Sequence, residues 1–173
     1  LFVRRLLDNE KLHITLTGSS SKLLSKEIAT SLRGRGITTE IFPFSFREAL
    51  SHENPKIQLT QKPGAESRAF MENHMRRYLI QGGFPEIQSI EENYKIQILQ
   101  EYVDVVILRD IVERYGVVNV QALRVMVRHL LADSASLFSV NKFYHDLRSQ
   151  GITCTKNTLY DYLDYLHDAY LIF

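Results

Sequence analysis

The stretch of sequence that decides the fold runs from Leu12 to Phe46 and reads LHITLTGSSSKLLSKEIATSLRGRGITTEIFPFSF. Apolar and polar residues alternate at its start, which is typical of a half-covered strand. A polar turn, a helix with one apolar stripe, a glycine-rich turn and a second extended run are predicted to follow. The segments are Leu12–Leu16, Thr17–Ser21, Lys22–Leu32, Arg33–Gly36 and Ile37–Phe44. Their order predicts one strand–helix–strand step of a nucleotide-binding α/β sheet.

The polar residues of this stretch are candidates for a nucleotide site. Ligands of an open α/β sheet lie beyond the carboxyl ends of its strands, where the turn with Ser19 and Ser20 is expected. Arg33 and Arg35 are permanent cations suited to the charge that develops on a transferred phosphate. The sequence contains no GxxxxGKS or GxxxxGKT loop and no apolar run ending in an Asp-Glu pair, so the loop that cradles phosphates is absent from it. A solvated helix face followed by a turn remains the alternative interpretation.

Length and composition limit the class of protein. A chain of 173 residues with 45% hydrophobic and 24% charged residues is an ordinary globular protein of one large or two small domains. The net charge of +1 gives no general attraction to nucleic acid or membrane. No apolar run approaches the roughly 18 residues of a membrane span, and the start has no signal-peptide pattern. The single cysteine, Cys154, excludes an internal disulfide and fits a reducing cytoplasm.

The rest of the chain is predicted to be helical, so the expected fold class is α+β and mostly α, a remnant of a P-loop α/β core followed by helices. Residues 51–67 contain two prolines and a glycine, which is typical of a connection. We therefore expect a core part over residues 1–50, a linker over 51–67 and a helical domain over 68–173. Apolar spacing and caps predict the helices Phe70–Ile80, Tyr94–Tyr115 and Val120–Leu131, and two more after Ser139 and Thr155.

The helix Tyr94–Tyr115 gives the strongest helical pattern, and its apolar residues lie on most sides, which predicts a buried helix. Gly82–Pro85, before it, is interpreted as a turn. Asp104 and Asp110 are six residues apart and do not share a helix face, so a paired-carboxylate site is not expected. None of the six histidines has a second histidine or cysteine at ligand spacing, so a zinc site is not expected either.

The last 35 residues have the spacing of a helix-turn-helix, with Ser139 and Thr155 as N-caps and a tight turn at Gly151. Tyr170–Phe173 is predicted to begin the first strand of a wing, which makes the winged helix truncated. The residues expected to face inward are Val140, Phe143, Leu147, Leu159, Leu163 and Leu166.

DNA contact is one interpretation of this end of the chain. The candidate DNA-binding residues are Lys156, Asn157, Thr158 and Tyr160 on the second helix. Residues 139–173 carry three cations against four anions, whereas DNA binding depends heavily on the neutralisation of phosphates. A protein–protein or intersubunit module therefore remains the alternative.

Five stretches, in the same order, carry a resemblance to a known family: TLTGSSSKLLSKEIATSLRGR, EIFPFSFREAL, YLIQGGFPEI, YVDVVILRDIVERYGV and FSVNKFYHDLRSQGITCTKNTLYDYLDYLHDAYLIF. They resemble the AAA-type ATPases of bacteria and archaea that carry a C-terminal winged-helix-like domain of unknown function. The resemblance implies that Ser19 and Ser20 are sensor residues that report on the γ-phosphate. It also implies that Arg35, with Arg33 near it, is the arginine finger that reaches a neighbouring subunit's nucleotide.

On this resemblance we expect the chain to be a C-terminal fragment of an AAA-type ATPase of the cytoplasm. ATP and Mg²⁺ are then expected in the complete protein and none is expected to bind tightly to this chain, because the Walker A and B segments would lie upstream. The implied partners are neighbouring subunits of the same protein in a homo-oligomer, and no membrane. The alternative is a nonenzymatic winged-helix module that binds DNA or protein. An independent enzyme has no nucleophile–base pair, metal cluster or paired carboxylates to support it.

Overall fold

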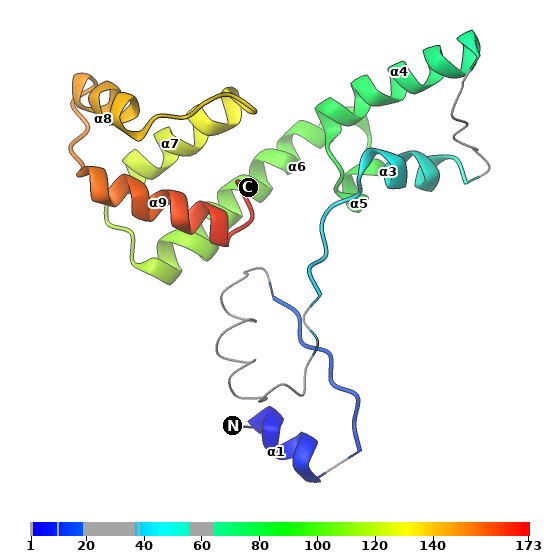
Figure 1. The fold of residues 1–173 in the computed structure, drawn as a ribbon, viewed down its shortest axis with the longest axis horizontal. Helices are drawn as coiled ribbons and strands as arrows, with labels where there is room; N and C mark the ends of the chain where they lie inside the picture. Colours follow the sequence, from blue (N-terminus) through cyan, green and yellow to red (C-terminus); the bar gives the residue numbers. More distant parts are fainter. Residues whose placement is uncertain (1, 10, 19–36, 38, 56–63) are drawn as a thin grey trace. The chain divides into compact units, whose positions relative to one another are not determined.

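The computed structural model of the chain describes residues 2–9, 11–18, 37, 39–55 and 64–173. In this part of the chain every regular element is a helix (Figure 1), so the mostly helical character is confirmed. The strand predicted at Leu12–Leu16 is wrong: residues 11–18 have no regular structure and Leu12 is 50% exposed. A strand needs a neighbour to pair with its backbone, and the described residues offer none. The predicted helix Lys22–Leu32 and turn Arg33–Gly36 lie outside the described residues.

The chain divides into two compact units, and the first helix, α1 (Phe2–Asn9), belongs to the unit that also contains the C-terminal residues. One unit is residues 39–103, and the other comprises residues 1–38 and 104–173. The first unit contains α3 (Phe46–Glu53), α4 (Ala65–Gln81), α5 (Pro85–Gln88) and most of α6 (Glu92–Val105). Its buried apolar side chains are Ala49, Leu50 and Ile87.

Helix α3 was not predicted, and a local signal explains why it forms. Ser45 is its N-cap: the Ser45 hydroxyl accepts a hydrogen bond from the Glu48 N–H, and the Glu48 carboxylate accepts one from the Ser45 N–H at 2.8 Å. This reciprocal pair is a capping box, which satisfies two backbone donors that the first turn leaves unpaired. Residues 51–53 of the expected linker therefore belong to α3, and residues 65–67 belong to α4.

The Gly82–Pro85 segment ends α4, as predicted, and it also makes a tertiary contact. Gly82 has a φ of 72° and a ψ of −168°, a conformation that only glycine adopts readily, and its N–H donates the last helical hydrogen bond to the Tyr78 carbonyl. Gly83 is buried, its carbonyl accepts a hydrogen bond of 2.7 Å from the Phe44 N–H, and a Cβ at Gly83 would collide with the Phe44 carbonyl. Phe44 also accepts a hydrogen bond of 2.7 Å from the Tyr78 hydroxyl. This close backbone approach explains why glycine stands at position 83.

The predicted helix Tyr94–Tyr115 is continuous but not uniform. After α6 the backbone becomes a π-helix, η2 (Val106–Glu113), before a last α-helical turn at residues 114–115. Ile107 and Ile111 are buried in it, whereas Ile96 is 62% exposed and Val105 is 52% exposed. The prediction of a helix buried on most sides is therefore wrong within the described residues. A π turn contains an extra residue, so the side chains that follow it are rotated from their α-helical positions.

The C-terminal unit contains α7 (Val120–Ala132), α8 (Val140–Ser149) and α9 (Lys156–Asp168), drawn in yellow to red in Figure 1. The Ser139 and Thr155 hydroxyls cap α8 and α9, and Gly151 turns between them with a φ of 76°, all as predicted. Tyr162 is buried where Leu163 was expected, and Leu163 is half-buried. The largest fully buried side chains of this unit are Ile111, Leu123, Met126, Leu147, Leu159 and Leu166.

The wing strand predicted at Tyr170–Phe173 is wrong. These residues form a turn and an irregular end, and Tyr170 has a φ of 56°, which a strand does not adopt. The described residues thus contain the helix-turn-helix pair α8–α9 without a wing.

Candidate functional site

The residues predicted to act on the nucleotide, Ser19, Ser20, Arg33 and Arg35, lie outside the described residues. The structure therefore assigns them no geometry, and their roles stay predictions.

The candidate DNA-binding residues lie at the start of α9, where the Thr155 cap orients the first turn. Lys156, Asn157 and Tyr160 are exposed, Tyr160 by 53%. Thr158 is half-buried, its hydroxyl lies 2.8 Å from the Thr155 hydroxyl, and its N–H donates to the same atom. Thr158 thus belongs to the cap, and the other three side chains remain available for contacts.

Two cations lie beside one aromatic ring where α8 and α9 meet. The Lys156 Nζ lies 5.4 Å from the centroid of the Tyr144 ring, and the Arg148 Cζ lies 5.9 Å from it. Sequence reasoning missed Tyr144 and Arg148 as candidates. Their four-residue separation on α8 was the available signal, because such residues share a helix face.

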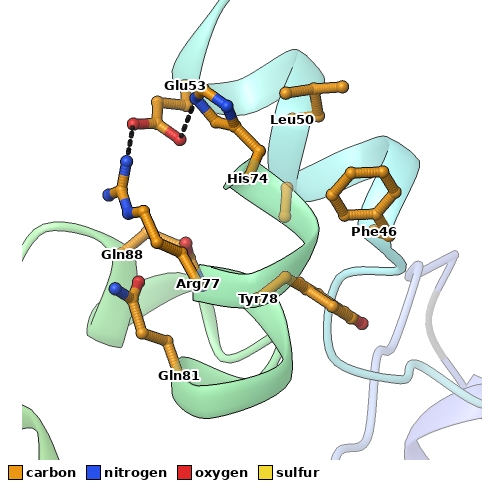
Figure 2. A pocket seen from close by; sticks show the side chains of 9 residues that line it. Phe46, Leu50, Glu53, His74, Arg77, Tyr78, Gln81 and Gln88 are labelled. Atoms are coloured by element: carbon orange, nitrogen blue, oxygen red, sulfur yellow. Dashed lines mark hydrogen bonds and ion pairs between the residues drawn. The ribbon is translucent and has the colours of Figure 1, made fainter. Parts of the chain in front are cut away.

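A small pocket lies within residues 39–103, between α3, α4 and α5 (Figure 2). Its volume is about 20 Å³, which is room for about one water molecule. Small-molecule sites usually have volumes of roughly 300–1,000 Å³. The pocket is therefore too small to bind a substrate. Its walls come from Phe46, Ala49, Leu50, Glu53, His74, Arg77, Tyr78, Gln81 and Gln88.

The charged side chains at this pocket join α3 to α4. Glu53 accepts a hydrogen bond of 3.0 Å from Arg77, and its other oxygen lies 3.7 Å from His74 Nε2, as the dashed lines in Figure 2 show. The His74 Nδ1 lies 2.8 Å from the Phe70 carbonyl oxygen, so it donates there. This leaves Nε2 to face Glu53. The Glu53–Arg77 ion pair joins the two helices, and the arrangement brings together no nucleophile and base.

The π-helix and its continuation place charged and aromatic groups against α9. Arg114 lies 3.8 Å from the buried Asp110, one helical turn earlier. The Tyr115 hydroxyl donates to Asp168 at 3.0 Å, and the Tyr115 ring stacks on the Tyr165 ring at 3.8 Å. These contacts join two helices of the same unit. They explain why Asp110 and Asp168 are tolerated in buried positions, since a buried charge needs partners.

The setting of Cys154 disfavours its reactive thiolate form. The thiol is half-buried, and burial raises its pKa, so the reactive thiolate is scarcer than for a free cysteine. In the part of the chain that the structure describes, no three histidine, cysteine or acidic side chains gather as a metal site. Among the same residues, no helix has the length and apolar character needed to cross a membrane.

Comparisons with known proteins give the chain its family. The profile of the family described as "Domain of unknown function (DUF8612)" matches residues 72–173, which is more than half of the chain, and the chain belongs to this family. The profile described as "AAA domain" matches residues 1–50. The N-terminal part is thus related to AAA domains, and a domain of unknown function follows it.

Two relatives have similar sequences over nearly all of the chain. Uncharacterized protein MJ1544 of Methanocaldococcus jannaschii is 42% identical over 99% of this chain and 38% of its own length. An uncharacterized protein of Haemophilus influenzae is 32% identical over 92% of this chain and 38% of its own length. The chain therefore spans less than half of the length of these relatives. No solved structure matches the chain.

Proposed function

We propose that the chain is the C-terminal portion of an AAA-type ATPase, in which residues 1–50 complete the ATPase domain and residues 68–173 form an accessory helical domain. The observation that carries this proposal is the AAA match over residues 1–50, which residues 51–71 separate from the match over residues 72–173. The relatives are more than twice as long as the matched region, which leaves room for the upstream half of an ATPase domain. The single cysteine suits a cytoplasmic protein.

In the proposed reaction, residues of this chain act on a nucleotide whose phosphates are bound by other parts of the complete protein. The sequence has no phosphate-binding loop, so ATP and Mg²⁺ would be held by residues upstream. Ser19 and Ser20 would detect the γ-phosphate. Arg35, supported by Arg33, would offer a permanent cation to the charge that develops during phosphoryl transfer. Because an arginine finger acts on a neighbouring subunit's nucleotide, the active form would be a homo-oligomer.

The contact between Phe44 and Gly83 supports a mechanical link between the two matched segments. Phe44 lies within residues 1–50, and Gly83 and Tyr78 lie within residues 72–173. Phe44 donates its N–H to the Gly83 carbonyl and accepts the hydroxyl of Tyr78, both at 2.7 Å. A movement of the backbone at Phe44 would therefore displace the end of α4. This is a route by which nucleotide state would reach the helical domain.

A mixing experiment tests the proposed role of Arg35. Wild-type complete protein is mixed with increasing amounts of the Arg35→Ala variant, and MgATP turnover per wild-type subunit is measured. Turnover per wild-type subunit should not rise as the variant is added, because each intact Arg35 serves one neighbouring nucleotide and the variant supplies no finger of its own. An arginine finger accounts for roughly a thousandfold or more in rate, so the pure variant should be nearly inactive while it still binds ATP.

The matched control is Arg76→Ala, which removes an exposed arginine from α4. Its addition should raise turnover per wild-type subunit, because the control subunits keep Arg35 and hydrolyse ATP themselves. Full turnover in pure Arg35→Ala protein would remove the finger role.

A binding module is the second candidate function. The observation that favours it is the capped helix-turn-helix pair α8–α9, whose first exposed residues include Lys156 and Asn157. The partner of such a module would be DNA or a protein. Absence of turnover in the complete protein would favour this candidate.

A further inference from the structure

We propose that Tyr144, Arg148, Lys156 and Tyr160 form a nucleic-acid-binding surface, the α8–α9 strip, which contacts the sugar-phosphate backbone and stacks on bases. This proposal deepens the binding-module candidate by naming the ligand class and by adding two residues of α8. It does not depend on ATP turnover, so it can fail or succeed independently of the ATPase proposal.

The geometry of the strip comes from two pairs of residues that meet at one ring. On α8, Arg148 follows Tyr144 by four residues, and on α9, Tyr160 follows Lys156 by four residues, so each pair shares a helix face. The pairs meet because the Lys156 Nζ lies 5.4 Å from the Tyr144 ring centroid, beside Arg148 at 5.9 Å. Each helix thus contributes one cation and one tyrosine.

The side chains of the strip are accessible. Arg148 and Lys156 are exposed, Tyr160 is 53% exposed and Tyr144 is half-buried. The core is built by other residues of α8, so the tyrosine rings are not needed to fill it. Among the ion pairs of the described residues, none involves Arg148 or Lys156, so both charges remain available to a ligand.

Positive and negative residues lie in different parts of this end of the chain, a difference that the net charge of residues 139–173 does not show. Residues 140–157 carry three cations and one anion, a net charge of +2. Residues 158–173 carry three aspartates and no lysine or arginine. Three of the four strip residues lie in the positive part and Tyr160 lies at its border beside Asp161, so a polyanion would be attracted to the strip and repelled from the distal half of α9.

The combination of cations and tyrosines favours nucleic acid over other polyanions. Cations follow a phosphate backbone, and aromatic rings stack on bases of any sequence, as in single-strand binding surfaces. Asn157, next to Lys156 at the start of the second helix, would also suit a duplex groove. An acidic protein segment would pair with the cations but would offer no flat partner to the rings. The shared chemistry is the phosphodiester strand with its bases, single or paired.

Fluorescence anisotropy of the 173-residue chain tests the proposal. The probes are a fluorescein-labelled DNA single strand of mixed sequence, its duplex, and a labelled polyglutamate peptide, at about 50 and 200 mM salt. The test variant is Arg148→Ala/Lys156→Ala. The matched control is Arg68→Ala/Arg76→Ala, which removes the same charge from exposed positions on α4. Tyr144→Ala and Tyr144→Phe separate loss of the ring from loss of the hydroxyl, and circular dichroism checks folding.

The wild-type chain should bind one or both DNA probes. The slope of log affinity against log salt concentration is negative, and its magnitude should be smaller by roughly 1.4–1.8 in the test variant. The test variant should lose about tenfold in affinity at the higher salt, and the control should stay within about twofold. Tyr144→Phe should bind as the wild type does, and Tyr144→Ala several-fold more weakly. The stronger of the two DNA probes identifies the natural form of the ligand.

Three results would overturn the proposal. The first is no binding of either DNA probe by the wild-type chain at the lower salt. The second is an equal loss of affinity in the test and control variants. The third is tighter binding of the polyglutamate peptide than of both DNA probes, which would assign the strip to an acidic protein partner. If Tyr144→Ala fails to fold, the comparison of the two double variants still shows whether Arg148 and Lys156 bind DNA.

Discussion

Replacement of Gly83 with alanine is expected to destabilise residues 39–103, because the new methyl group has no space. An alanine Cβ would lie 2.9 Å from the Phe44 carbonyl carbon and 3.0 Å from the Phe44 nitrogen, and closer still to the carbonyl oxygen. These atoms are backbone, so no flexible side chain can move aside. The chain would have to separate Phe44 from Gly83 and strain or break their 2.7 Å hydrogen bond.

The magnitude follows from two contributions. An extra methyl group in a packed site costs about 1–3 kcal/mol. Loss of the hydrogen bond between the Phe44 N–H and the Gly83 carbonyl adds about 0.5–1.5 kcal/mol. Together they predict a loss of about 2–4 kcal/mol in unfolding free energy. Gly64→Ala is the control for the added methyl group, because no atom lies within 4 Å of its Cβ and its φ of −64° suits alanine; as the N-cap of α4, it should cost only about 0.5–1 kcal/mol.

Native-state hydrogen exchange of the α4 amides, followed as a function of urea, measures this loss within the unit itself. Tyr78→Phe alone should cost about 0.5–1.5 kcal/mol, since it removes the hydroxyl donor to Phe44. The double variant Tyr78→Phe/Gly83→Ala should cost at least about 0.5 kcal/mol less than the sum, because both changes act through Phe44. If Gly83→Ala costs no more than Gly64→Ala, the close approach of Phe44 is refuted.

Three further predictions concern other parts of the chain. Leu147→Ala, at a side chain with no exposed surface, should lower the unfolding free energy by about 2–5 kcal/mol in urea titrations, whereas fully exposed Leu137→Ala should change it by less than about 0.5 kcal/mol. The Ser45 hydroxyl and N–H hold the pKa of Glu48 below its usual value of 4.5, so the stabilisation that the Glu48 carboxylate adds to this cap is present at neutral pH and lost as the pH falls through the folded pKa. The effect of Ser45→Ala on amide exchange in α3 should accordingly be smaller in acid than at neutral pH, because the Ser45 hydroxyl then keeps its bond to the Glu48 N–H and loses the one to the carboxylate. Because burial raises the pKa of Cys154, its alkylation at mildly alkaline pH should be slower in the folded chain than in urea, and equal rates would contradict the buried thiol.

The helix-turn-helix end was predictable because its determinants are local. The capping hydroxyls of Ser139 and Thr155 bind the backbone N–H three residues further on, and a glycine at position 151 by itself indicates a positive φ. The inward residues follow from the helical period alone, and Val140, Phe143, Leu147, Leu159 and Leu166 are buried as expected. Tyr162 is buried although Leu163 was expected to be. A tertiary contact explains this difference, since the Tyr162 hydroxyl donates to the Asn119 carbonyl.

The remaining features depend on contacts between distant residues. The strand expected at Leu12–Leu16 had the right alternation, but a strand forms only beside another strand, and pairing cannot be derived from one segment. The need for glycine at position 83 comes from Phe44, thirty-nine residues away. The Tyr144–Lys156 contact likewise depends on how α8 and α9 meet across Gly151. Helix α3 is an exception, because it depends on a local signal, the capping box of Ser45 and Glu48. It was not predicted because the proline-containing residues after it were interpreted as a connection.

The most direct test of the central claim is MgATP turnover, measured at equal subunit concentrations for the 173-residue chain, the complete protein and the complete protein carrying Arg35→Ala. The account predicts turnover by the complete wild-type protein alone, because this chain lacks a phosphate loop and Arg35 serves the neighbouring nucleotide. Absence of turnover in the complete protein, or turnover by the 173-residue chain itself, would contradict the assignment of this chain as the C-terminal portion of an AAA-type ATPase.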